Sequence, residues 1–184
     1  MISMALCPLL IKKLDERKAY ILLSVYGFAA SIFSFVIGHF WFQSPDNMVL
    51  TVLFYASLFL IGLQFGAVTL MPMIMTADCV DYYEYETGKR MEGAAYSILT
   101  LTIKVCLALG TAVGLIFVQV SGYYGALGAG TFTTKTKDII FFAYTALPGV
   151  LALLSIFPMF KYDIVGEKKA QISAALSQRR AGKE

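Results

Sequence analysis

The sequence predicts an all-α integral membrane protein. Of its 184 residues, 58% are hydrophobic and only 15% are charged, and the mean hydropathy is +0.70. A soluble domain usually carries about 25% charged residues. Four long stretches are also almost free of charge, and each exceeds the roughly 20 residues that cross a bilayer core. We therefore expect four complete transmembrane helices plus the end of a fifth.

The first eighteen residues are expected to be the end of a truncated helix and a basic cytoplasmic loop. Residues 1–11 form an apolar run that is too short to span, and charged residues follow it between Lys12 and Lys18. A signal peptide has the opposite order, with its positive charges before the apolar core. The region 19–160 then holds four spans, expected at about 20–42, 48–77, 94–120 and 139–160.

Several residues within the spans have a predictable structural role. The first span ends in an aromatic cluster around Trp41, which is typical of a membrane interface, so we favour an interfacial role for His39 over a proton relay. Pro72 is expected to kink the second span, because proline cannot donate a backbone hydrogen bond. Two glycine pairs have the GxxxG spacing that favours close helix packing: Gly62 with Gly66, and Gly110 with Gly114.

A charged run separates the second span from the third. Among the seventeen residues from Thr76 to Glu92, seven are charged: Asp78, Asp81, Glu84, Glu86, Lys89, Arg90 and Glu92. Such a density of charge must lie in water. We therefore expect an aqueous loop from Asp78 to Glu92.

Lys104 is the unusual residue of the third span. Apart from tyrosine and cysteine, it is the only ionisable side chain between Glu92 and Lys135. At 1.5 Å per residue, it lies about 15 Å from the start of the span at Ala94, near the middle of the core. An intramembrane lysine costs roughly 2.5–3.5 kcal/mol, and it normally faces protein or a watery cavity beside a negative partner.

The distribution of basic residues predicts the orientation. Twelve of the fifteen lysines and arginines fall in the N-terminal segment, in the charged run or in the tail 161–184, and only two fall on the opposite side. The positive-inside rule then places both termini in the cytoplasm of a multi-pass protein of the inner (plasma) membrane. For the tail, we favour a mobile segment over one that rests on anionic lipid.

No pattern in the sequence indicates catalysis, a metal site or nucleic-acid binding. There is no HExxH, P-loop or GxSxG motif, and the cysteines and the histidine lack the spacing of metal ligands. Basic residues are not interleaved with aromatic ones on a polar surface. We expect neither an enzyme nor a cofactor, and the lipid bilayer is the first expected partner.

The charged run and the start of the third span resemble the glycoside-pentoside-hexuronide:cation symporters, the melibiose permease relatives within the major facilitator fold. The resemblance covers the whole chain, which corresponds to the C-terminal part of such a bundle. The residues that carry it are Ala77, Asp78, Asp81, Tyr82, Glu84, Tyr85, Gly88, Arg90, Glu92, Gly93, Tyr96, Ser97 and Lys104.

The resemblance implies a function and two groups of residues. It implies a segment of a secondary transporter that couples a sugar or glycoside to Na⁺ or H⁺, and that does not transport without the missing N-terminal half. The substrate and cation pathway would include Ser97, Thr100, Ile103 and Lys104. A cytoplasmic gating network would include Asp78, Asp81, Glu84 and Arg90.

The alternative is a self-contained four-span membrane adaptor without transport activity. Such a protein should supply its own negative partner for Lys104. The sequence places every aspartate and glutamate in a loop or in the tail, so we expect none to reach the depth of Lys104. This expectation favours the transporter segment.

Overall fold

The computed structural model describes residues 14–123 and 133–181, apart from the side chains of Ala67 and Val68. Within these ranges all regular structure is helical, which confirms the all-α class. The helices are α2 (Glu16–Gln43), α3 (Met48–Thr87), α4 (Glu92–Val120), α5 (Thr134–Tyr144), α6 (Ala146–Leu154), α7 (Ile156–Met159) and α8 (Gly166–Ala181). The expected end of a fifth span falls on residues 1–11, outside the described residues.

Four helical segments of the described chain are long and apolar enough to cross a membrane. They are Glu16–Gln43, Met48–Thr87, Glu92–Val120 and Thr134–Met159. Each contains most of one predicted span. Length and composition therefore predict where the spans lie, but the helices of the structure begin and end at other residues than predicted.

The largest difference concerns the charged run, where the expected loop from Asp78 to Glu92 is wrong. Helix α3 continues to Thr87 and ends at Gly88, whose φ of 70° lies in the left-handed region that glycine adopts without strain. Its 40 residues extend about 60 Å, twice the thickness of a bilayer core. The acidic residues therefore lie on the projecting end of a helix, and only a short connection leads to α4.

The last span is divided into α5, α6 and α7, and two prolines explain the divisions. Pro148 cannot donate to the carbonyl of Tyr144, where α5 ends, and Pro158 cannot donate to that of Leu154, where α6 ends. Hydroxyl groups lie at both breaks: Thr145 donates to the carbonyl of Phe141 at 2.7 Å, and Ser155 donates to that of Ala152 at 2.6 Å.

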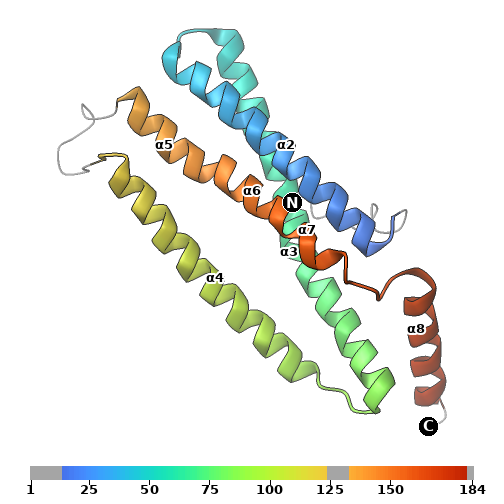
Figure 1. The fold of residues 1–184 in the computed structure, drawn as a ribbon. Helices are drawn as coiled ribbons and strands as arrows, with labels where there is room; N and C mark the ends of the chain where they lie inside the picture. Colours follow the sequence, from blue (N-terminus) through green and yellow to red (C-terminus); the bar gives the residue numbers. More distant parts are fainter. Residues whose placement is uncertain (1–13, 124–132, 182–184) are drawn as a thin grey trace.

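Helix α2 packs between α3 and α6, while α4 stands apart from it (Figure 1). The close approach of α2 depends on small residues: a Cβ added to Gly149 of α6 would lie 2.6 Å from the Cβ of Ser31. By contrast, a Cβ at Gly62, Gly110 or Gly114 would meet no described atom within 4 Å. These three glycines of the expected GxxxG pairs therefore make no close helix contact with the described residues.

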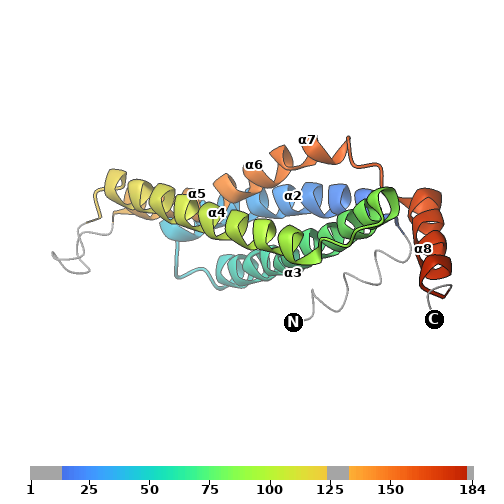
Figure 2. The same ribbon diagram turned by 90° about the horizontal axis from the view of Figure 1, so that it is seen from below.

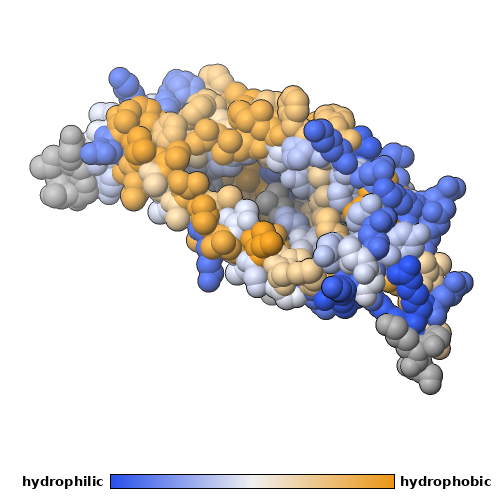
Figure 3. All heavy atoms as spheres, turned by 60° about the horizontal axis from the view of Figure 1, so that its bottom comes forward, coloured by the Kyte–Doolittle hydropathy of each residue, from blue (hydrophilic) through white to orange (hydrophobic). Residues whose placement is uncertain are grey.

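The expectation of a mobile tail is wrong. Residues 166–181 form α8, which packs against α3 and buries the side chains of Ile172 and Leu176. Figure 2 shows α8 at one end of the bundle, beside the last turns of α3. Hydrophilic surface gathers at the same end in Figure 3, whereas hydrophobic surface covers much of the rest of this face.

Candidate functional site

Three of the four residues expected along the transport pathway lie together on α4. Ser97, Thr100 and Lys104 line one shallow, open depression, whereas Ile103 does not line it. The two hydroxyls bond to their own helix, Ser97 to the carbonyl of Gly93 at 2.7 Å and Thr100 to that of Tyr96 at 2.8 Å. The depression therefore combines the ammonium of Lys104 and two hydroxyls with apolar surface such as that of Leu101.

Lys104 has no acidic partner among the described residues. No residue of α4 is buried, although α4 is one of the four segments that can span a membrane. The amine therefore belongs to a face that other described helices leave uncovered. An ammonium in such a segment requires a negative partner or water.

Three of the four residues expected in the gating network form one cluster around Arg90. Its guanidinium donates to Glu84 Oε2 at 2.8 Å and to Asp81 Oδ1 at 3.2 Å. It also donates through Nε to Glu92 Oε2 at 3.0 Å, at the first residue of α4. The hydrogen bonds to Glu92 and Glu84 raise the pKa of Arg90 above its ordinary value, so the guanidinium stays charged. Arg90 thus joins the last turns of α3 to the start of α4.

Asp78 belongs to a second cluster, which the sequence did not predict. Its carboxylate lies 2.7 Å from the ammonium of Lys169 on α8, and that ammonium also donates to Glu16 Oε1 of α2 at 2.7 Å. The hydroxyl of Tyr162 donates to Asp78 Oδ2 at 3.1 Å. Burial and the charge of Asp78 raise the pKa of Tyr162, which keeps its phenol protonated as the donor. The partners come from distant parts of the chain, and no local pattern signals them.

A third polar contact joins α2 to α5. His39 Nδ1 lies 3.0 Å from Asp138 Oδ2, and His39 Nε2 lies 2.8 Å from Gln43 Nε2. The sequence predicted that every aspartate and glutamate lies in a loop or in the tail. This prediction is wrong, because Glu16, Asp78 and Asp138 lie in helices. None of the three pairs with Lys104.

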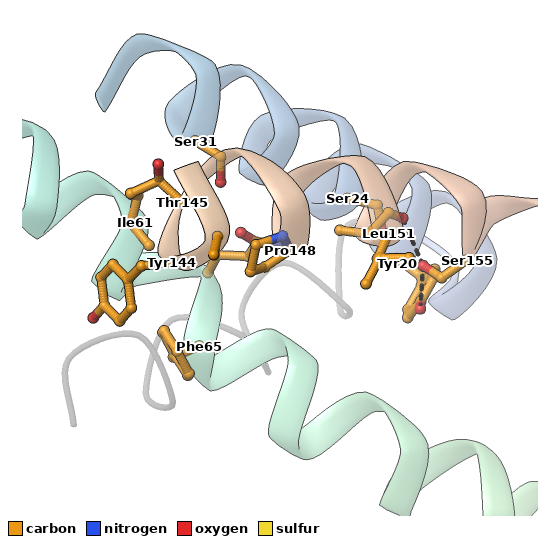
Figure 4. Close-up of a pocket in the computed structure, with 13 residues that line it drawn as sticks. Tyr20, Ser24, Ser31, Ile61, Phe65, Tyr144, Thr145, Pro148, Leu151 and Ser155 are labelled. Atoms are coloured by element: carbon orange, nitrogen blue, oxygen red, sulfur yellow. Dashed lines mark hydrogen bonds between the residues drawn. The ribbon is translucent and has the colours of Figure 1, made fainter. Parts of the chain in front are cut away.

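The structure also contains a cavity of about 470 Å³ between α2, α3 and the α5–α6 segment (Figure 4). Its lining includes the carboxamide of Gln64, which is 9% exposed and has no hydrogen-bond partner within the described ranges. Tyr20 and Ser155 close one end through a 2.8 Å hydrogen bond, visible in the same view. No residue expected at the transport site lines this cavity.

Comparison with known proteins identifies the family. A family model described as MFS/sugar transport protein matches residues 1–166. An uncharacterized 29.9 kDa protein of Pseudescherichia vulneris is 27% identical over 154 residues, which cover 84% of this chain and 54% of that protein. The inner membrane symporter YicJ of Escherichia coli is 31% identical over 108 residues, 59% of this chain and 23% of the symporter.

A putative sulfoquinovose importer of Escherichia coli is 26% identical over 184 residues, 98% of this chain and 36% of that protein. The chain thus spans from about a quarter to about half of these relatives' lengths. No solved structure matches it at a significant level. The family match confirms the resemblance drawn from the charged run and Lys104, and it covers most of the chain. The chain therefore belongs to the MFS/sugar transport protein family, a family of membrane transporters and not of enzymes.

Proposed function

We propose that this chain is the C-terminal segment of a secondary transporter that couples the movement of a sugar or glycoside to Na⁺ or H⁺. The observation that carries the proposal is that the ammonium of Lys104 has no acidic partner among the described residues and lies on α4, a helix without a buried residue. The names of two relatives, a symporter and a putative sulfoquinovose importer, support the substrate class and the coupling.

The position of Lys104 favours a site that another part of the transporter completes. Lys104 lies twelve residues after the start of α4 at Glu92, about 18 Å along the helix. A charged side chain at such a depth needs a counter-charge, and no acidic residue of the described chain forms an ion pair with Lys104. A missing N-terminal half that brings carboxylates to the face of α4 would meet this need. A self-contained adaptor would leave the amine unpaired.

Each group of residues has a role in this proposal. Ser97, Thr100 and Ile103 belong to the sugar pathway, and Lys104 to the cation site. The Arg90 cluster, with Asp81 and Glu84, is a gate that holds one end of the bundle closed. Asp78 contributes to the same gate through its separate contact with α8.

The test is a transport assay with and without the remainder of the protein. This chain alone, reconstituted in lipid vesicles, is expected to show no sugar-dependent cation flux, because alternating access needs two halves that rock around a midplane site. A longer form that includes the missing half should show it. Coupled flux from this chain alone would refute the segment proposal.

The orientation is part of the proposal and has its own assay. Since twelve of fifteen basic residues fall on one side, a reporter after Glu184 or within 87–91 should be cytoplasmic, and one within 43–47 external. An external C-terminal reporter would contradict the inner-membrane topology with both termini inside.

A further inference from the structure

We propose that α8 is a conformational latch. When docked, α8 holds the neighbouring ends of α2 and α3 together, and Lys169 is the residue that keeps it docked. Its release would let these ends move apart. The inference uses only contacts within this chain, and it stands whether or not the chain carries sugar.

Lys169 is positioned to join two helices that would otherwise repel each other at this end. Glu16 of α2 and Asp78 of α3 are each only 8% exposed, and both carboxylates lie 2.7 Å from the same ammonium. Without the ammonium, two negative charges would remain close together away from water. Removing one partner of a buried ion pair is strongly destabilising, because it leaves a buried charge uncompensated.

The sequence of α8 builds one docking face around Lys169. Ile172 and Leu176 follow it at intervals of three and four residues, so that all three share one side of the helix. Ile172 is 5% exposed and Leu176 is 3% exposed. Apolar burial thus adds to the ion pairs on this side. The face explains why a helix with a polar composition packs on the bundle.

The far end of the same face reaches the Arg90 cluster. Arg180 Nη2 lies 3.0 Å from Glu84 Oε2, the oxygen to which Arg90 also donates, and Arg179 donates to the carbonyl of Tyr85 at 2.9 Å. The docked α8 therefore contacts α2 and the end of α3, where Glu84 accepts hydrogen bonds from both Arg180 and Arg90. Undocking would change the charge balance at Glu84 as well as at Asp78.

A neighbouring lysine provides a matched control. Lys168 pairs with Asp163 at 2.9 Å, in the tail segment just before α8, and both side chains are exposed. Its ammonium also lies 5.3 Å from the centroid of the Tyr82 ring on α3. Lys168 thus contacts α3, but it does not bridge two spanning helices. Neutralising Lys168 or Lys169 removes the same charge from α8, but only Lys169 contacts the buried carboxylates.

The experiment measures distances in the full chain, reconstituted in lipid nanodiscs after replacement of its native cysteines. Spin labels at Tyr83 of α3 and Ser177 of α8 report docking, and labels at Lys18 of α2 and Tyr83 report the separation of the two helix ends. Lys169→Gln is expected to add a population of longer distances for both pairs. Lys168→Gln should retain the single short population. Unchanged distances in Lys169→Gln would overturn the proposal.

A second measurement avoids any failure of the variant to fold. In the chain without either substitution, 1 M salt shortens the screening length to about 3 Å. It should weaken the exposed pairs of Arg180 more than the pairs of Lys169, whose two carboxylates are buried. The short Tyr83–Ser177 distance should persist. Its loss at 1 M salt would show that surface charges hold α8, and would refute the role of Lys169.

Discussion

The contact between α2 and α6 leads to a quantitative prediction for Gly149→Ala. The added Cβ would lie 2.6 Å from the Cβ of Ser31 and 3.6 Å from the Cα of Phe28, both atoms fixed to α2. Carbon atoms pack best at about 3.5–4.0 Å, so α6 must move away from α2 by about 1 Å. Such overpacking costs about 1–3 kcal/mol.

A gain in helix propensity offsets part of this cost. Replacing glycine by alanine inside a helix stabilises it by about 0.5–1 kcal/mol, which leaves a net loss of about 0–2.5 kcal/mol, centred at roughly 1 kcal/mol, for Gly149→Ala. The matched control is Gly62→Ala, because a Cβ at Gly62 meets no described atom within 4 Å. Gly62→Ala should keep or slightly raise the free energy of unfolding.

The assay is unfolding of the purified chain in detergent micelles, followed by far-ultraviolet circular dichroism. Gly149→Ala should unfold at a lower concentration of denaturant than the unsubstituted chain. If Gly149→Ala is as stable as Gly62→Ala, the close approach of α2 and α6 is wrong.

Two further predictions address Lys104 and Lys169. In a transporter that contains this segment, the Lys104→Gln variant should still reach the membrane, while cation-stimulated sugar uptake collapses because the cation site loses its charge. Sugar uptake with normal ion dependence would contradict a coupling role for Lys104. Loss of the protein from the membrane would indicate a structural role. For Lys169, burial disfavours the charged form, but hydrogen bonds to Asp78 and Glu16 outweigh it and raise the pKa above the ordinary 10.5. Because the pKa of Lys169 is raised when α8 is docked, its ion pairs stabilise docking fully at pH values below the ordinary pKa. This stabilisation is lost as the pH rises through the raised pKa. The Tyr83–Ser177 distance should therefore stay short from pH 7 to 10, and lengthening near pH 8 would disagree with this pairing.

The transmembrane spans and the polar face of α4 could be predicted because both depend on local composition and spacing. A run of apolar residues crosses a bilayer whatever its neighbours are, and Ser97, Thr100 and Lys104 share a side of any helix that contains them. The end of α3 was missed for a related reason. Dense charge indicates contact with water, but it does not distinguish a loop from a helix that projects beyond the membrane.

What the sequence by itself determined is the all-α membrane class, the approximate spans, the family and the exceptional position of Lys104. Only the tertiary structure decided which charges pair. Lys169 meets Glu16 and Asp78 across 153 and 91 positions of sequence, and His39 meets Asp138 across 99. The physical reason is that an ion pair depends on the separation of two atoms in space. That separation follows from how α2, α3, α5 and α8 pack, and local spacing along the chain does not contain it.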